Sequence, residues 1–92
     1  MPLDLHRKDT NEWIFSLDEN LFAKLSPLFK EFKLRTGISF DYYKDFLLSV
    51  GHQKILVELI NEFQLNDFPI MLLKNKLTES IENKIDIQLY CD

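Results

Sequence analysis

Large apolar residues recur at three- and four-residue spacing in the first third of the chain, and this stripe constrains the fold more than any other feature. Such spacing places them on one face of a helix that packs against a core. We expect Asp18 to cap this helix and Gly37 to end it. The stripe keeps its phase across Pro27, which predicts one kinked helix, although Ser26 and Pro27 could instead begin a second one. The stripe consists of Leu21, Phe22, Leu25, Leu28, Phe29 and Phe32.

Two further helices are predicted in the second half of the chain. Ser49 is expected to cap a helix of about residues 50–64. Asp67 is expected to cap a third helix that has Pro69 in its first turn and stops at Asn83. Their apolar faces are formed by Leu56, Leu59, Ile60 and Phe63, and by Ile70, Leu73, Leu77 and Ile81.

Strand patterns lie near both ends of the chain. Residues 85–91 alternate strictly between apolar and polar, and residues 12–16 are rich in aromatic and β-branched types. A short strand around Leu3 and Leu5 is possible, whereas residues 38–48 show no clean period and are expected to form an ordered loop. The sequence therefore predicts an α+β fold in which about three helices pack on a small two-stranded sheet, formed by pairing segments 12–16 and 85–91.

Composition limits the functions that such a domain can have. At 92 residues, the chain fits a single domain over residues 1–92. Its net charge of −4 argues against nucleic acid and suits a basic protein partner. A single cysteine, Cys91, allows no internal disulfide, and no apolar run approaches the roughly 18 residues of a membrane span. We therefore expect a cytoplasmic protein that does not enter a membrane.

The sequence lacks recognisable catalytic motifs. Its two glycines cannot form a phosphate-binding loop. His6, His52 and Cys91 do not have the spacing of zinc ligands, so we expect neither a metal nor a cofactor. Ser49 and His52 could neighbour each other, but a capping serine beside a solvent-facing histidine explains them better. The prediction is that this chain is not an enzyme.

The most informative stretch is FDYYKDFLLSVGH, residues 40–52, where Asp41, Tyr42, Tyr43 and Asp45 gather. Tyrosine suits interfaces because it combines a large apolar face with a hydroxyl, and the carboxylates could meet Arg or Lys on a partner. These residues could instead fill the core and cap the backbone, or serve as an acid–base pair. We predict that they bind a partner.

A second acidic pair, Glu58 and Glu62, lies one helical turn apart on the second predicted helix. Like charges at this spacing repel each other slightly. They could form an ordinary solvated face or an acidic docking face for a basic protein. We include both residues in the predicted partner-binding set.

Four segments resemble small acidic bacterial proteins that include immunity partners of secreted toxins. They are FKEFKLRTG (29–37), ISFDYYKDFLLS (38–49), ILVELI (55–60) and IQLYCD (87–92). The resemblance implies a cytoplasmic protein that binds a toxin domain and blocks its active site. The alternative is a small homodimeric regulatory or adaptor protein without a toxin partner.

Overall fold

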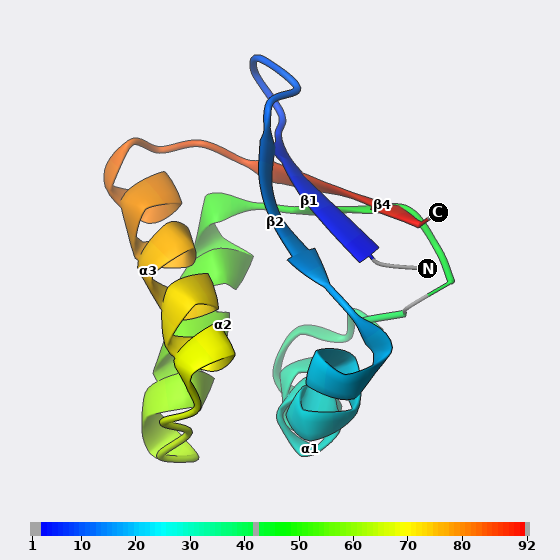
Figure 1. Ribbon diagram of the computed structural model, residues 1–92, viewed down its shortest axis with the longest axis vertical. Coiled ribbons are helices and arrows are strands. Elements are labelled where there is room, and N and C mark those ends of the chain that lie inside the picture. Colours follow the sequence, from blue (N-terminus) through cyan, green and yellow to red (C-terminus); the bar gives the residue numbers. More distant parts are fainter. Residues whose placement is uncertain (1–2, 42, 92) are drawn as a thin grey trace.

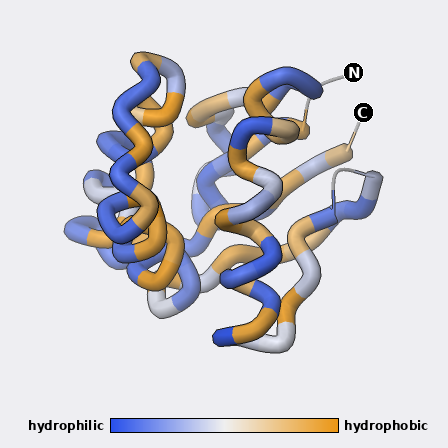
Figure 2. The backbone as a smooth tube through the Cα atoms, turned by 90° about the horizontal axis from the view of Figure 1, so that it is seen from below, coloured by the Kyte–Doolittle hydropathy of each residue, from blue (hydrophilic) through white to orange (hydrophobic). Residues whose placement is uncertain are grey.

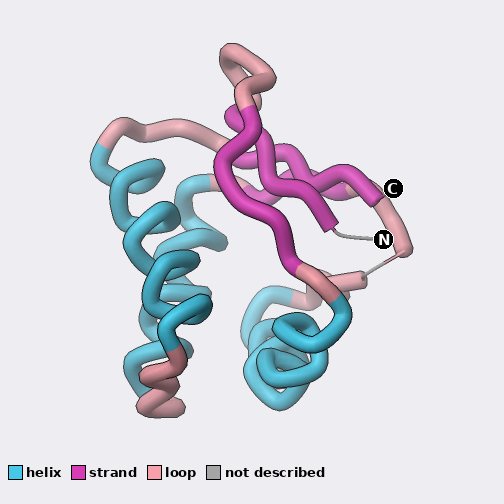
Figure 3. Tube along the Cα trace, in the orientation of Figure 1, coloured by secondary structure: helices cyan, strands magenta, loops and turns pink. Residues whose placement is uncertain are grey.

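The computed structural model describes residues 3–41 and 43–91. Within them, helices pack on one side of a four-stranded antiparallel sheet, so the fold is α+β as predicted (Figures 1 and 3). The elements in chain order are β1 (Leu3–Arg7), β2 (Trp13–Leu17), α1 (Glu19–Thr36), β3 (Phe46–Leu48), α2 (Val50–Glu62), α3 (Phe68–Glu82) and β4 (Ile87–Cys91).

Helix α1 begins and ends where the sequence predicts. Oδ1 of Asp18 accepts a hydrogen bond from the Leu21 backbone N–H at 2.8 Å. Gly37 has a φ of 77°, and its N–H donates to the Lys33 carbonyl oxygen at 2.7 Å. Pro27 lies inside the helix, so a single helix crosses the proline rather than two. Five of the six stripe residues are buried, namely Leu21, Leu25, Leu28, Phe29 and Phe32.

Helices α2 and α3 also follow their predicted boundaries closely. The Ser49 hydroxyl oxygen accepts from the His52 backbone N–H at 3.3 Å, which confirms the cap. Asp67 precedes α3 without a capping side-chain hydrogen bond, and Pro69 stands in the first turn. In Figure 2, hydrophobic and hydrophilic residues alternate along the helices, as expected for helices with one buried face.

The predicted two-stranded sheet is wrong in size and in pairing. The strand order is β2-β1-β4-β3, so β1 separates the two segments that were expected to pair. Leu5 opposes Phe15 of β2 on one side and Leu89 of β4 on the other. Leu3 and Leu5 are almost fully buried, and this is the physical reason that the first strand takes an inner position, next to β4.

The segment expected to be a loop, residues 38–48, ends in the short strand β3. Phe46 opposes Leu89, and Leu48 opposes Ile87, at the edge of the sheet. Three residues are too few for a visible two-residue period, and the edge position leaves Leu47 exposed. On the core-facing side of the sheet, Phe15 and Phe46 are partly buried, and the fully buried residues are Leu3, Leu5, Leu17, Leu48, Ile87 and Leu89.

None of the helices in the described part of the chain combines the length and apolar character that a membrane crossing requires.

Candidate functional site

The predicted loop site is tied to the edge of the sheet. Oδ1 of Asp41 accepts from the Tyr43 backbone N–H at 2.8 Å, which is the local turn that aspartate favours. Oδ1 of Asp45 accepts from the Cys91 N–H at 2.7 Å and so fastens the loop to β4. Tyr43 is 77% exposed, whereas Tyr42 lies outside the described residues. Both aspartates therefore have structural roles, which leaves Tyr43 as the accessible contact residue of this loop.

The second predicted pair lies elsewhere. Glu58 and Glu62 are exposed on α2, and Oε2 of Glu62 accepts from Nη2 of Arg35 at 2.9 Å. Figure 1 places α2 on the opposite side of the molecule from the loop that leads into β3. The structure does not combine Glu58 and Glu62 with residues 41–45 into one surface.

The side of the sheet that faces away from the helices forms a third candidate, which we call the open sheet face. Its residues alternate with the buried ones along each strand. The register sets Asp4 between Ser16 and Tyr90 and sets His6 between Trp13 and Gln88. The open sheet face consists of Asp4, His6, Trp13, Ser16, Leu47, Gln88 and Tyr90.

Trp13 is exposed on this face and yet has a fixed orientation. It is 61% exposed. Its Nε1–H donates to the Ser16 hydroxyl oxygen at 2.8 Å, and that hydroxyl donates to Oδ1 of Asp4 at 2.6 Å. A large ring that is already oriented loses little conformational entropy on binding, and tryptophan is enriched among the residues that dominate binding energy.

A second ordered pair occupies the neighbouring strands. The rings of His6 and Tyr90 meet edge to face, with centroids 5.1 Å apart. Nδ1 of His6 lies 3.0 Å from the Asn11 carbonyl oxygen, and the Tyr90 hydroxyl donates to Oδ1 of Asn11 at 3.2 Å. The hairpin loop between β1 and β2 therefore orients both rings, and the open sheet face is preorganised over β2, β1 and β4.

The structure gives Ser49 and His52 other contacts than the catalytic pairing considered in the sequence. Ser49 caps α2, and the ring of His52 packs edge to face on Phe32 with centroids 6.0 Å apart. In the described ranges, 3–41 and 43–91, no cluster of three or more His, Cys, Asp or Glu side chains could hold a metal ion.

Sequence reasoning missed most of the open sheet face. Trp13 was assigned to a strand, but its direction depends on a β-bulge opposite the step from Leu5 to His6. Asp4 and Ser16 become neighbours only through the pairing of β1 with β2. The alternation of leucine with polar residues at the start of the chain was the signal that could have located this face.

Comparisons with known proteins place the chain in no family. No family model matches, and no solved structure matches significantly. A 3-dehydroquinate synthase from Clostridium tetani (strain Massachusetts / E88) is 27% identical over 81 residues, which cover 83% of this chain and 22% of that enzyme. The chain thus spans about a fifth of the length of the curated protein that it matches.

Proposed function

We propose that this chain is a protein-binding domain whose partner docks on the open sheet face, with Asp41, Tyr43 and Asp45 at its border. One observation carries the proposal: Trp13 is 61% exposed and is held by hydrogen bonds on a face that the helices leave uncovered. Leu47, at 44% exposure, and Tyr43 add apolar contact area at the other edge of the sheet. Aromatic anchors on a polar background are typical of protein interfaces.

The charge of the chain favours a basic partner. Its net charge is −4, and Asp4 contributes a carboxylate to the open sheet face, while Asp41 and Asp45 border it. Opposite charge accelerates encounter and orients the two proteins. In this interpretation, the aromatic side chains provide contact area and the carboxylates set the approach.

In its most specific form, the proposal is that the chain is an immunity protein that neutralises a bacterial toxin by occluding it. The support is the resemblance of residues 29–37, 38–49, 55–60 and 87–92 to such proteins. A rigid domain with an exposed, ordered face is suited to occlusion because little conformational entropy is lost on binding. The predicted residues Glu58 and Glu62 would lie outside the contact, since both are on α2 and not on the open sheet face.

The experiment measures the affinity of this chain for the product of the neighbouring gene. Trp13→Ala and Leu47→Ser are each expected to weaken binding about tenfold or more, as for residues that anchor an interface. Leu34→Ser is the matched control, because Leu34 is 81% exposed but lies on α1. Circular dichroism establishes that each variant is folded.

Unchanged affinity in the folded Trp13 and Leu47 variants would remove the open sheet face from the proposal. Sedimentation at several concentrations tests the alternative. A stable dimer that binds no toxin would support the homodimeric regulatory or adaptor protein instead.

A further inference from the structure

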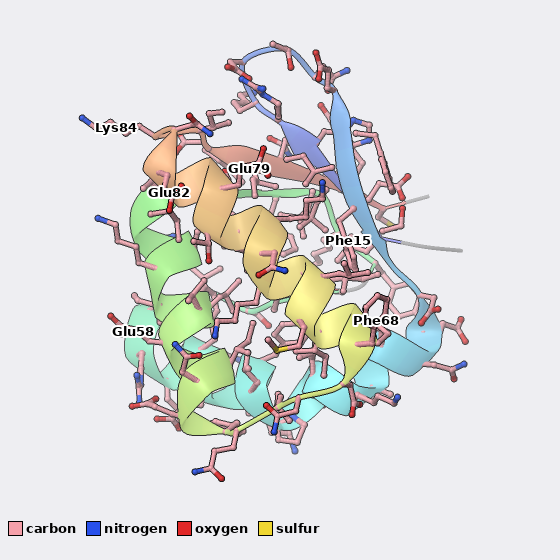
Figure 4. All side chains as sticks on the ribbon, turned by 60° about the vertical axis from the view of Figure 1, so that its left-hand side comes forward. Phe15, Glu58, Phe68, Glu79, Glu82 and Lys84 are labelled. Atoms are coloured by element: carbon pink, nitrogen blue, oxygen red, sulfur yellow. The ribbon has the colours of Figure 1, made fainter. Side chains whose placement is uncertain are left out.

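A hollow of about 220 Å³ lies beside the open sheet face, between the β1–β2 hairpin and the C-terminal half of α3. In Figure 4, Glu79 lies on the part of α3 next to the hairpin, whereas Glu58 lies away from it on α2. The hollow is lined by Arg7, Glu12, Trp13, Ile14, Lys76, Glu79, Ser80, Asn83 and Ile85.

The size of the hollow suits one small molecule with an apolar part. Cavities of roughly 150 Å³ hold a benzene ring, while pockets for larger ligands span about 300–1,000 Å³. Trp13 and Ile14 supply the apolar wall. The ring of Trp13 keeps its position through its hydrogen bond to Ser16, so this wall exists before a ligand arrives.

Charges of both signs surround this apolar wall. Arg7 and Lys76 are the cations, and Glu12 and Glu79 are the anions. The pKa of Arg7 is raised chiefly by its hydrogen bond to Asp9, and the charges of Glu12 and Glu79 make smaller contributions in the same direction. Within the described residues, Glu12, Lys76 and Glu79 form no ion pair, which leaves a cation and two carboxylates available to a ligand.

We propose that this hollow binds a small zwitterion, namely a free α-amino acid with an apolar side chain. Lys76 faces its carboxylate, Glu12 and Glu79 face its ammonium group, and Trp13 with Ile14 receives its side chain. A purely anionic or cationic ligand would leave one set of charges unmatched. The site goes beyond the protein-binding proposal: it shares Trp13 with the open sheet face, but its charged residues Lys76 and Glu79 lie on α3 and not on that face.

The test follows the indole N–H resonance of Trp13 by NMR, which is unambiguous because the chain has one tryptophan. We expect L-phenylalanine to shift this resonance saturably. N-acetyl-L-phenylalanine lacks the ammonium group and L-phenylalaninamide lacks the carboxylate. Each is expected to bind about three- to fivefold more weakly, as for loss of one exposed charge pair.

Substitutions assign each charge to its partner. Lys76→Met should weaken the binding of L-phenylalanine by a similar factor. It should leave the affinity for L-phenylalaninamide unchanged, because the amide has no carboxylate for Lys76 to bind. Glu79→Gln should weaken the binding of L-phenylalanine and leave the affinity for N-acetyl-L-phenylalanine unchanged. Lys84→Met and Glu58→Gln are matched controls outside the hollow, and both should bind like the unaltered chain.

Two results would overturn the proposal. Absence of a saturable shift up to the solubility limit of L-phenylalanine would show that no such site exists. Equal affinities for the three compounds would show an apolar crevice without recognition of a zwitterion.

Discussion

The side-chain amide of Gln53 donates to the backbone carbonyl oxygen of Ile85 at 2.9 Å, from a fully buried position near the start of α2. The same nitrogen donates to the Leu48 carbonyl oxygen at 3.0 Å. One side chain therefore joins the end of β3 to the segment that enters β4. Its Nε2 makes both of these bonds, while its buried Oε1 has no partner among the described residues. Loss of the amide removes the donors to two backbone carbonyl groups.

Replacing Gln53 by leucine should lower the free energy of unfolding by about 1–3 kcal/mol, the cost of leaving a buried backbone acceptor unsatisfied. The Ile85 carbonyl keeps its hydrogen bond from the Ser80 hydroxyl, so the Leu48 carbonyl bears most of the loss. Urea unfolding measures the change. An unchanged midpoint and slope would show that the amide does not clamp the two segments.

Replacing Gln53 by glutamate should destabilise the protein in a pH-dependent way. A buried carboxylate is disfavoured in its charged form, so its pKa in the folded state rises above the unfolded value of about 4.3. The extra destabilisation therefore appears as the pH rises above that unfolded pKa and is relieved in acid, where the protonated carboxyl can donate a hydrogen bond. Unfolding curves at neutral and mildly acid pH test the sign, with Gln64→Glu as the exposed counterpart.

The helices could be predicted because their signals are local. Asp18, Ser49 and Gly37 act within one turn of the helix ends that they define, and the apolar stripes repeat over several turns. The sheet could not be predicted in the same way. β1 and β4 come from opposite ends of the chain, and the choice of the strand containing Leu3 and Leu5 as an inner one depends on which residues the helices bury.

The candidate sites also differ in whether they depend on local sequence or on contacts between distant segments. The exposure of Tyr43 follows from a local turn made by Asp41, which the sequence suggests. The fixed position of Trp13 requires Ser16 and Asp4, which meet only after two strands have paired in the correct register. The hollow requires α3 to lie against the hairpin, and no pattern within either segment encodes that contact.

Replacing Ser16 by alanine should release the ring of Trp13 while leaving the fold intact. The substitution removes the acceptor for the indole N–H and the donor to Asp4. Tryptophan fluorescence anisotropy should fall, and the free energy of unfolding should drop by about 0.5–1.5 kcal/mol, as for one ordinary hydrogen bond. Ser39→Ala, at an exposed position before the 41–45 loop, is the control. Unaltered anisotropy in Ser16→Ala would mean that the hydrogen bond does not orient the ring.

The two glycines should respond to alanine in opposite directions. Gly37 has a φ of 77° and no atom within 4 Å of an added Cβ, so Gly37→Ala should cost about 1–2 kcal/mol of stability from backbone strain alone. Gly51 lies in the first turn of α2, where an added Cβ would meet only the Ser49 hydroxyl oxygen at 4.0 Å. Gly51→Ala should therefore stabilise the protein by about 0.4–1 kcal/mol, because alanine restricts the unfolded chain. Thermal unfolding of both variants checks the signs, and a loss in both would contradict this assignment.

Asp9 at the hairpin tip should titrate below its ordinary range. Arg7 donates to both of its carboxylate oxygens, Nε to Oδ1 at 3.0 Å and Nη2 to Oδ2 at 2.9 Å. This hydrogen bonding lowers the pKa of Asp9, with a smaller contribution from the Thr10 N–H. Because the folded pKa lies below the unfolded one, the pair stabilises the hairpin above the unfolded pKa and loses that contribution as the pH falls through the folded value. The effect on unfolding is small because both groups are exposed to solvent.

The direct measurement is an NMR titration of the Asp9 carboxyl carbon. In Arg7→Met, the pKa of Asp9 should rise toward its ordinary value, since the strongest cause of the shift is gone. Lys8→Met is the matched control, because Lys8 carries the same charge next to Asp9 in the chain but forms no ion pair with it in the described residues. If both variants raised the pKa of Asp9 equally, the positive charge near the hairpin tip, and not the hydrogen bonds from Arg7, would be the cause of the lowered pKa.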